Sequence, residues 1–296
     1  AVRQRGLYPY FRAIQENRGT TVVIDGRELV MLGSNNYLGL SYDPRVKEAA
    51  IEAIRKYGTS CSGSRFLNGT IALHEELEAR LAAFVGKETA LVFSTGYQTN
   101  LGAIAALVSS VDHVFIDRYN HASIMDGLFL ASGLVKKNMK FVRYRHNDMA
   151  DLERKLQAVP EDAPKLIVTD GVFSMEGSIV RLPDMHALAQ RHRARIYLND
   201  AHALGVLGAR GKGTEEHYGG GHPADLIMCT FSKSFGSLGG FVAGDTDVVD
   251  FIRHFSRSMI FSAAIPPSNT AAVLKSLEII VQEPERVRRV QEIGAK

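Results

Sequence analysis

Short apolar runs alternate with amphipathic segments along most of the chain, from residue 88 onwards. Segments with a helical spacing of apolar residues begin near 97 and 121 and cover 149–159 and 183–193. The apolar runs between them stand at 90–94, 113–117, 140–145, 165–172, 195–200, 225–232 and 239–244. This alternation predicts an α/β fold with a mostly parallel central sheet and helices on both of its faces.

The two ends of the chain have different patterns. Residues 21–32 predict two short strands around Asp25-Gly26, a dipeptide typical of a tight hairpin turn. Helical spacing predicts helices at 44–57, 71–86, 247–259 and 267–282. We therefore expect an N-terminal segment with a hairpin over 1–45, a large α/β domain over 46–260, and the beginning of a C-terminal segment over 261–296.

Composition excludes several classes of function. With 296 residues, 45% of them hydrophobic and 23% charged, the chain is long enough for a sizeable core and ordinary for a globular protein. The net charge of +3 and the lack of a Lys/Arg run argue against nucleic acid as a partner. No apolar run approaches the ~18 residues of a membrane helix, so no integral membrane segment is expected.

The cysteines and histidines do not indicate a metal site. Cys61 and Cys229 are far apart in the chain and form no CxxC pair, and no HExxH motif is present. The pattern favours a reduced, cytoplasmic protein without a disulfide framework.

Polar residues follow most of the predicted strands. In a parallel sheet, ligands bind beside the carboxyl ends of the strands, so these residues are the candidates for a site. They are Ser94–Gly96, Asn120-His121, Asp170–Ser174, Asn199–His202 and Thr230–Lys233.

Lys233 carries the strongest chemical signal. It comes just after a predicted buried strand, has hydroxyl side chains at Thr230, Ser232 and Ser234 around it, and precedes the glycine-rich stretch 236–240. A lysine in such a setting can have a lowered pKa and form an imine with an aldehyde cofactor. The alternative is a solvated lysine at a strand end, the commoner fate of lysines in general.

Weaker signals come from the other strand ends. Gly96 stands at a predicted strand-to-helix turn, where free backbone N–H groups would hold a phosphate, although a plain helix cap is at least as common. His121 and His202 each follow a strand and present a flat ring that can stack on an aromatic cofactor or donate a hydrogen bond to it. A lone histidine is more often structural.

Taken together, these stretches resemble the α-oxoamine synthases, which are pyridoxal 5′-phosphate (PLP) enzymes of fold type I. These enzymes condense an amino acid with an acyl-CoA and release carbon dioxide. The matching stretches are GSNNYLGLS (33–41), GSRFLNGT (63–70), HEELEARLAAFVG (74–86), FSTGYQTNLG (93–102), NHASIMDG (120–127), TDGVFSMEG (169–177), DAHALGVLG (200–208) and TFSKSFGSLGGFVAG (230–244). Within the family, GLYPYFRAIQ (6–15) and GSRFLNGT are most similar to the bacterial serine palmitoyltransferases.

The resemblance implies a role for each candidate residue. Lys233 would hold PLP as a Schiff base and move the proton at the amino acid Cα. His121 would stack on the ring, and His202 with Ser174 would contact its 3′-oxygen. The remaining assignments are Gly96, Tyr97 and Thr230 on the phosphate, Ser262 on the phosphate of a neighbouring subunit, and Asn36 near the substrate carboxylate. The shared phosphate site implies a homodimer.

The chain departs from the family pattern in two places. The family has an aspartate three residues before the histidine that matches His202, where it pairs with the protonated ring nitrogen; here the residue is Asn199. Asp200 is acidic, but neighbouring side chains of a strand point to opposite faces, so we do not expect it to substitute. Family members also continue into a small C-terminal domain, which we expect to be missing from this chain.

The resemblance predicts a PLP-dependent acyltransferase that joins an amino acid, L-serine, to a long-chain acyl-CoA and forms a 3-oxo-sphinganine-type product of sphingolipid biosynthesis. One alternative is a family member that uses glycine or alanine, of the 8-amino-7-oxononanoate synthase or 2-amino-3-ketobutyrate CoA ligase type. The other alternative is a weakly active or non-catalytic dimer partner, which Asn199 favours and Lys233, His121 and His202 oppose.

Overall fold

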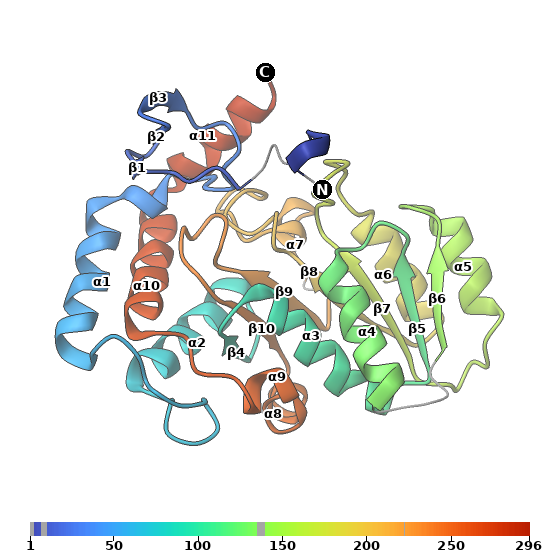
Figure 1. The fold of residues 1–296 in the computed structure, drawn as a ribbon. Helices are drawn as coiled ribbons and strands as arrows, with labels where there is room; N and C mark the ends of the chain where they lie inside the picture. The colour runs from blue at the N-terminus through green and yellow to red at the C-terminus, as the bar shows by residue number, and fades with distance from the viewer. Residues whose placement is uncertain (1–2, 7–10, 135–139, 222) are drawn as a thin grey trace.

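A central sheet of seven strands runs through the molecule, with helices on both sides (Figure 1). The computed structural model describes residues 3–6, 11–134, 140–221 and 223–296. In spatial order, the strands are β4 (Thr89–Phe93), β10 (Gly240–Gly244), β9 (Leu226–Thr230), β8 (Ala194–Asn199), β7 (Lys165–Asp170), β5 (His113–Asp117) and β6 (Lys140–Tyr144). All seven strands were predicted from the apolar runs.

The sheet is mostly parallel, which confirms the prediction. Strands β6, β5, β7, β8 and β9 pair in parallel, whereas β10 is antiparallel to both β9 and β4. Because two antiparallel steps restore the direction, β4 runs the same way as β9. The carboxyl ends of β4, β5, β7, β8 and β9 therefore meet along one edge of the sheet, which we call the carboxyl edge; the opposite side is the amino edge.

Alternate side chains of each strand enter two separate hydrophobic cores. In β7, Ile167 belongs to one core and its neighbours Leu166 and Val168 to the other. Helices α2 (Ala72–Val85), α5 (Met149–Gln157), α6 (Leu182–Arg191) and α10 (Pro267–Gln282) cover the first face. Helices α3 (Gly96–Leu107), α4 (Ala122–Leu134), α8 (Thr246–Phe255) and α9 (Arg257–Ile260) cover the second.

The predicted N-terminal hairpin is present. Strands β2 (Thr21–Ile24) and β3 (Arg27–Val30) pair in antiparallel register around Asp25 and Gly26, whose φ angles of 52° and 70° fit a type I′ turn. A two-residue strand β1 (Glu16–Asn17), which was not predicted, adds to β2. Residues 7–10 of the GLYPYFRAIQ stretch lie outside the described residues.

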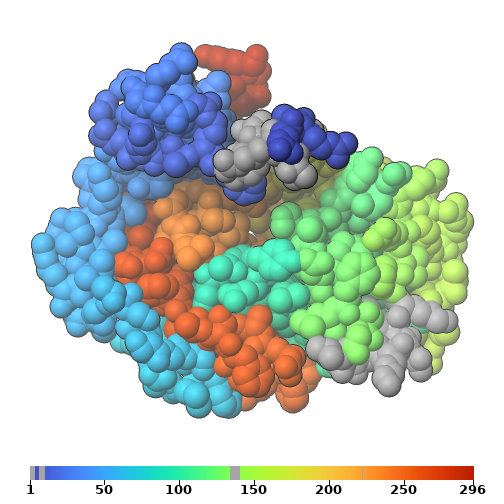
Figure 2. Space-filling model, viewed as in Figure 1, coloured from blue at the N-terminus to red at the C-terminus, as the bar shows by residue number. Residues whose placement is uncertain are grey.

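The end of the chain differs from the prediction in two ways. The helix expected over 247–259 is interrupted at Ser256, whose extended backbone (ψ 109°) separates α8 from α9. A further helix, α11 (Pro284–Gly294), follows α10 after a break at Glu283 and was not predicted. In α11, Arg286 contacts Asp43 at 3.2 Å and so ties the end of the chain to its beginning, which lie together at the top of Figure 2.

The remaining elements are short or match the prediction closely. Helix α1 (Pro44–Tyr57) has the predicted bounds and packs against α10. The short helices are α7 (Thr214–His217), η1 (Arg3–Arg5), η2 (Leu40–Tyr42) and η3 (Val108–Ser110). Across the described part of the chain, no helix has the length and apolar character needed to cross a bilayer.

Candidate active site

The carboxyl edge of the sheet holds a cavity of about 280 Å³, which we call the carboxyl-edge cavity. The predicted site residues that line it are Gly96, Tyr97, His121, Asn199, His202, Thr230 and Lys233. The other lining residues are Thr95, Asn100, Ser123, Asp170, Ala201, Met228, Ser232, Leu238 and Gly239. Five separate strand ends thus deliver their polar residues to one place.

Ser174, Ser262 and Asn36 do not line this cavity. Ser262 Oγ accepts a hydrogen bond from Gln98 Nε2 at 3.1 Å, and Asn36 Oδ1 accepts one from the backbone N–H of Ser41 at 3.2 Å. Ser174 is exposed in the loop after β7. Their predicted roles involve a substrate, a cofactor atom or a second subunit, and they stay predictions.

Lys233 is placed by a tight turn that follows β9. The backbone N–H of Gly236 bonds to the Lys233 carbonyl at 2.9 Å, and the hydroxyl of the next residue, Ser234, donates to the carbonyl of Leu204 at 2.7 Å. Burial lowers the pKa of Lys233 below that of an ordinary lysine, although the Cys229 thiol and the Asp170 carboxyl act in the opposite direction. A lowered pKa gives a larger fraction of neutral amine, which is the nucleophilic form.

The first turn of α3 forms one wall of the cavity. Thr95 caps this helix through its side chain, which accepts from the N–H of Gln98 at 3.1 Å. Among the described residues, the N–H groups of Gly96 and Tyr97 have no hydrogen-bond partner, as is usual for the first positions of a helix. A Cβ on Gly96 would lie 2.5 Å from Thr230, so only glycine allows the two to approach this closely. The free N–H groups beside the Thr230 hydroxyl suit an anion such as phosphate.

His202 is held from behind by Tyr37, whose hydroxyl lies 2.7 Å from His202 Nδ1. Burial lowers the pKa of His202 to about 4, and the positive charges of Lys233 and His121 contribute. The ring is therefore neutral at physiological pH. Tyr37 was not predicted as a site residue, although it stands within the GSNNYLGLS stretch.

Asn199 and Asp200 are consecutive residues with different surroundings. Asn199 lines the cavity and its Oδ1 accepts from the N–H of Ala201 at 3.1 Å, which leaves its amide N–H₂ as the group available to a ligand. Asp200 instead accepts from the N–H and the hydroxyl of Thr214 at 2.8 and 2.5 Å, and burial raises its pKa to about 7. Asp200 is therefore committed elsewhere, as expected from the alternation of side chains along β8.

Asp170 is a carboxyl group of the cavity that the sequence predicts at a strand end but to which it assigns no role. It ends β7 directly beside Asn199 in the register of the sheet, and its Oδ2 accepts from the backbone N–H of His121 at 3.0 Å. Burial raises the pKa of Asp170 to about 7, against the lowering effects of the His121 N–H and Lys233. Its position at a strand end was the available signal.

These groups fit PLP, which is an aldehyde that carries a phosphate and an aromatic ring with polar atoms. The amine of Lys233 suits the aldehyde, the helix N-terminus with Gly96 and Thr230 suits the phosphate, and the imidazole rings suit the aromatic ring. A side chain at position 96 would fill the place where the phosphate is expected.

Comparisons with known proteins agree with this geometry. The profile of the family described as "Aminotransferase class I and II" matches residues 27–293. The chain is 51% identical over 289 residues to a serine palmitoyltransferase of Sphingobacterium spiritivorum, covering 98% of this chain and 71% of that protein. It is 46% identical to the 8-amino-7-oxononanoate synthase of Geobacter sulfurreducens, covering 96% and 71%.

The solved structures show the same relationship. A variant of the serine palmitoyltransferase from S. paucimobilis with bound PLP-myriocin aldimine superposes with a TM-score of 0.91 at 37% identity, covering 97% of this chain and 71% of that one. The fold class and the cofactor predicted from the sequence are thereby confirmed. The chain belongs to the class I and II aminotransferase family, among its α-oxoamine synthases, and is a PLP-dependent acyltransferase.

Proposed function

We propose that the enzyme condenses L-serine with a long-chain acyl-CoA and releases carbon dioxide and coenzyme A, forming a 3-oxo-sphinganine-type product. The observation that carries this proposal is the 51% identity with a serine palmitoyltransferase across 98% of the chain. Lys233 in a cavity with an anion-binding helix terminus supports the PLP chemistry that such a reaction requires.

The predicted site residues have proposed roles in holding the cofactor and the substrate. Gly96, Tyr97 and Thr230 would bind the phosphate through two backbone N–H groups and a hydroxyl. His121 would lie against the ring, and His202 with Ser174 would contact the 3′-oxygen. Asn36 and Ser262 keep their proposed roles at the substrate carboxylate and at the phosphate of a second subunit.

PLP, when bound, supplies an electron sink for the carbanion at the amino acid Cα. Lys233 supplies the base: its buried amine has a lowered pKa, which raises the fraction of neutral amine that can accept the Cα proton and return it later. His202 contributes a neutral imidazole, since a ring with a pKa of about 4 adds no positive charge beside Lys233.

Asn199 would face the ring nitrogen with a hydrogen-bond donor. Because its carbonyl oxygen is bound to the Ala201 N–H, the amide N–H₂ is the free group, and a donor favours an unprotonated ring nitrogen. An unprotonated ring withdraws electrons less strongly. We therefore expect slow turnover, which keeps the weakly active dimer partner as an alternative.

The second alternative is a synthase that uses glycine or alanine. The 46% identity with an 8-amino-7-oxononanoate synthase over 96% of the chain supports it, because this identity is only slightly below that with the serine-using relatives. We also propose that the protein is a homodimer and cytoplasmic; both remain predictions.

A substrate panel tests the proposal. The PLP-loaded protein is incubated with serine, glycine or alanine and with acyl-CoAs of increasing chain length, and free coenzyme A is measured. We expect release with serine and a long-chain acyl-CoA, and none in a Lys233→Ala variant. If coenzyme A release is faster with glycine or alanine than with serine, that amino acid would replace serine as the proposed substrate. A coloured, PLP-loaded protein without release from any pair would support the non-catalytic alternative.

A further inference from the structure

Three buried polar side chains form a hydrogen-bonded row behind His121. Tyr197 comes from β8, Asn100 from α3 and Ser123 from the first turn of α4, and their exposed fractions are 0, 1 and 1%. Tyr197 Oη lies 2.9 Å from Asn100 Oδ1, Asn100 Nδ2 lies 2.9 Å from Ser123 Oγ, and Ser123 Oγ lies 2.8 Å from His121 Nδ1. The row therefore connects the centre of the sheet to the ring of His121.

One bond fixes the direction of all the others. The backbone N–H of Ser123 points at His121 Nδ1 at 3.2 Å, and a backbone amide can only donate. His121 Nδ1 must therefore be an acceptor without a proton. The Ser123 hydroxyl, 2.8 Å from the same nitrogen, must then donate its proton to it, because two facing lone pairs would repel each other.

The direction then follows along the row. A Ser123 hydroxyl that donates to His121 accepts from Asn100, which must present its N–H₂ to it. The carbonyl oxygen of Asn100 is left for Tyr197, whose hydroxyl donates to it. The row has one consistent assignment, and every polar atom in it is used.

We propose that Tyr197, Asn100 and Ser123 are positioning residues that hold His121 as the neutral tautomer with its proton on Nε2. Protonation of His121 would place a proton on Nδ1 facing the backbone N–H of Ser123, which breaks that bond, and would force the Ser123 hydroxyl to turn its own proton away. The row therefore opposes an imidazolium at this position and also fixes the plane of the ring.

The charges around His121 act in the same direction. Burial lowers its pKa, and the positive charge of Lys233 lowers it further, while Asp126 of α4 raises it. His202 also lies within electrostatic range, and Asp170 accepts the backbone N–H of His121 at 3.0 Å. The row adds a hydrogen-bond constraint to these effects.

A neutral ring matters for the cofactor that we propose at this place, and this consequence rests on the proposed function. A neutral imidazole can lie against an aromatic ring of either charge without repulsion, whereas an imidazolium would oppose protonation of that ring. The assignment of the tautomer itself does not depend on the cofactor or on the substrate.

The tautomer can be measured in the cofactor-free protein by NMR with ¹⁵N-labelled histidine, where the His121 signals are identified by their loss in His121→Gln. We expect a protonated Nε2 and an unprotonated Nδ1 across the neutral pH range. Ser123→Ala and Tyr197→Phe should each raise the pKa of His121, by about 0.5 for the nearer change, while the backbone N–H of Ser123 keeps Nδ1 an acceptor in the neutral ring. Tyr218→Phe, which removes a hydroxyl bond to the Val180 carbonyl away from the cavity, should leave this pKa unchanged.

A proton on Nδ1 in the wild type would overturn the proposal. So would an unchanged pKa of His121 in Tyr197→Phe, which keeps the volume of the side chain and is the decisive variant if Ser123→Ala does not fold. The expected tautomer together with no coenzyme A release in the substrate panel would contradict the proposed function and leave the positioning row intact.

Discussion

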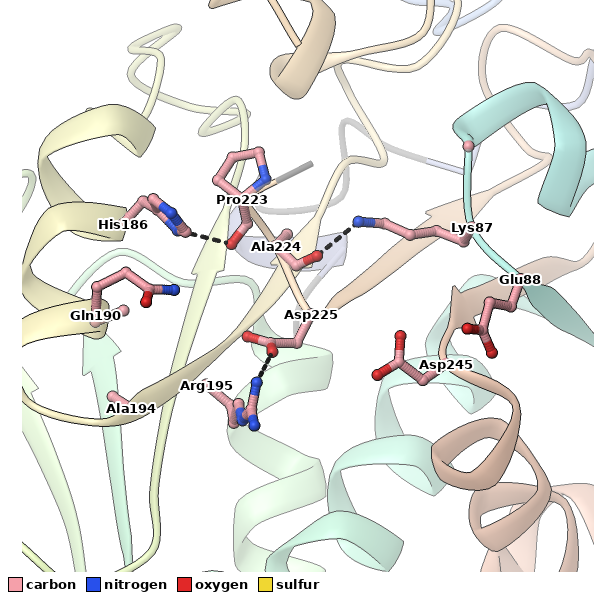
Figure 3. A pocket seen from close by; sticks show the side chains of 12 residues that line it. Lys87, Glu88, His186, Gln190, Ala194, Arg195, Pro223, Ala224, Asp225 and Asp245 are labelled. Carbon is pink, nitrogen blue, oxygen red and sulfur yellow. Dashed lines mark hydrogen bonds and ion pairs between the residues drawn. The ribbon is translucent and has the colours of Figure 1, made fainter. Parts of the chain in front are cut away.

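Two cavities of nearly equal size lie at opposite edges of the same sheet. The carboxyl-edge cavity measures about 280 Å³, and a cavity at the amino edge, between the starts of β4, β8 and β9, measures about 270 Å³ (Figure 3). Each contains a lysine, a histidine and at least one aspartate. Size and residue types alone therefore do not distinguish them.

The difference is in how the polar groups are used. At the amino edge, Lys87 Nζ donates to the Ala224 carbonyl at 2.6 Å (Figure 3). It also donates to Glu215 at 3.2 Å. Arg195 pairs with Asp225 at 2.7 Å there, and His186 bonds to the Pro223 carbonyl at 3.1 Å. These groups hold the fold together and have little left for a ligand.

At the carboxyl edge, the side-chain amine of Lys233 lines the cavity and has no hydrogen bond or ion pair within the described part of the chain. The N–H groups of Gly96 and Tyr97 at the start of α3 likewise have no partner among the residues that the structure describes. One nitrogen of each imidazole is already hydrogen-bonded, by Tyr37 to His202 and by Ser123 to His121, so that the other nitrogen is available. A buried polar group without a partner is costly unless a ligand supplies one. A functional site therefore differs from a structural cavity in that its polar groups are held in position but still lack hydrogen-bond partners.

The largest effect is expected from replacing the lysine of each cavity, one at a time, with alanine. Lys233→Ala should abolish the covalent attachment of PLP and lower turnover by about 100- to 10 000-fold, because the base is lost. Lys87→Ala should keep the visible absorbance of the bound cofactor and lower the free energy of unfolding, since it breaks the buried ion pair between Lys87 and Glu215. Absorbance spectra and coenzyme A release measure both. Loss of the cofactor in Lys87→Ala alone would reverse the assignment of the two cavities.

The second prediction concerns Asn199, where a carboxylate in place of the amide should raise the turnover of the carboxyl-edge site. A carboxylate facing the ring nitrogen favours its protonated form and strengthens the electron sink, so turnover should rise at least tenfold, about 1.4 kcal/mol in the barrier. Cofactor affinity should change much less, because the lysine and the phosphate contacts remain. An unchanged rate in an otherwise active protein would show that the amide does not limit the reaction, and Asp170 beside it would be the next carboxyl to test.

Each cavity is lined by one glycine at a helix end, Gly96 at the carboxyl edge and Gly86 at the amino edge, and the same substitution can be made at both. Gly96→Ala places a Cβ 2.5 Å from Thr230 and into the phosphate site, so PLP affinity should fall at least tenfold, about 1.4 kcal/mol. Gly86→Ala, at a position with φ 72° that ends α2, should cost stability, about 1 kcal/mol, and leave PLP affinity unchanged. Titration of the cofactor-free proteins with PLP, followed by absorbance, separates the two. Equal affinities would argue against a phosphate at Gly96.

The smallest effect concerns acid sensitivity. The pKa of His202 is about 4 in the folded protein, below its ordinary 6.5, so the unfolded chain binds more protons between these values. Its contribution to stability is therefore present above pH 6.5 and lost as the pH falls towards 4. His202→Gln should remove this loss, roughly 1 kcal/mol between pH 7 and 5 after allowance for solvent screening.

Urea unfolding at the two pH values measures this effect, with His186→Gln as the matched histidine removal. The raised pKa values of Asp170 and Asp200 act in the opposite sense over the same window, so only the difference between wild type and variant isolates His202. An identical loss in wild type and His202→Gln would refute a neutral His202.

The sequence predicted all seven strands of the main sheet because each is a short apolar run, and this pattern does not depend on tertiary contacts. It missed β1, which has two residues and no apolar run, and α11, which begins after a break at Glu283. The helix predicted over 247–259 is interrupted at Ser256, where the backbone is extended. The helical spacing of apolar residues continues past this position, so the sequence pattern did not reveal the break.

The site was predictable where a residue follows a strand and less so elsewhere. Tyr37, Asn100 and Tyr197 form hydrogen bonds with His202, Ser123 and Asn100, which are 165, 23 and 97 positions away in sequence. In sequence, each looks like an ordinary core or helix residue. Asp170 was placed at the correct edge, but its pairing with Asn199 depends on the order of strands, which the pattern does not reveal.

The most direct test of Lys233 as the cofactor residue is borohydride reduction of the PLP-loaded protein followed by peptide mapping. Reduction makes the bond between the cofactor and its lysine permanent, so the labelled residue can be identified by mass spectrometry. We expect the label on the peptide that contains Thr230–Lys233, and no label at Lys87, whose amine is already bound to Glu215 and Ala224. Recovery of the label on Lys87 or any other lysine, with Lys233 unmodified, would contradict the assignment of the carboxyl-edge cavity as the active site.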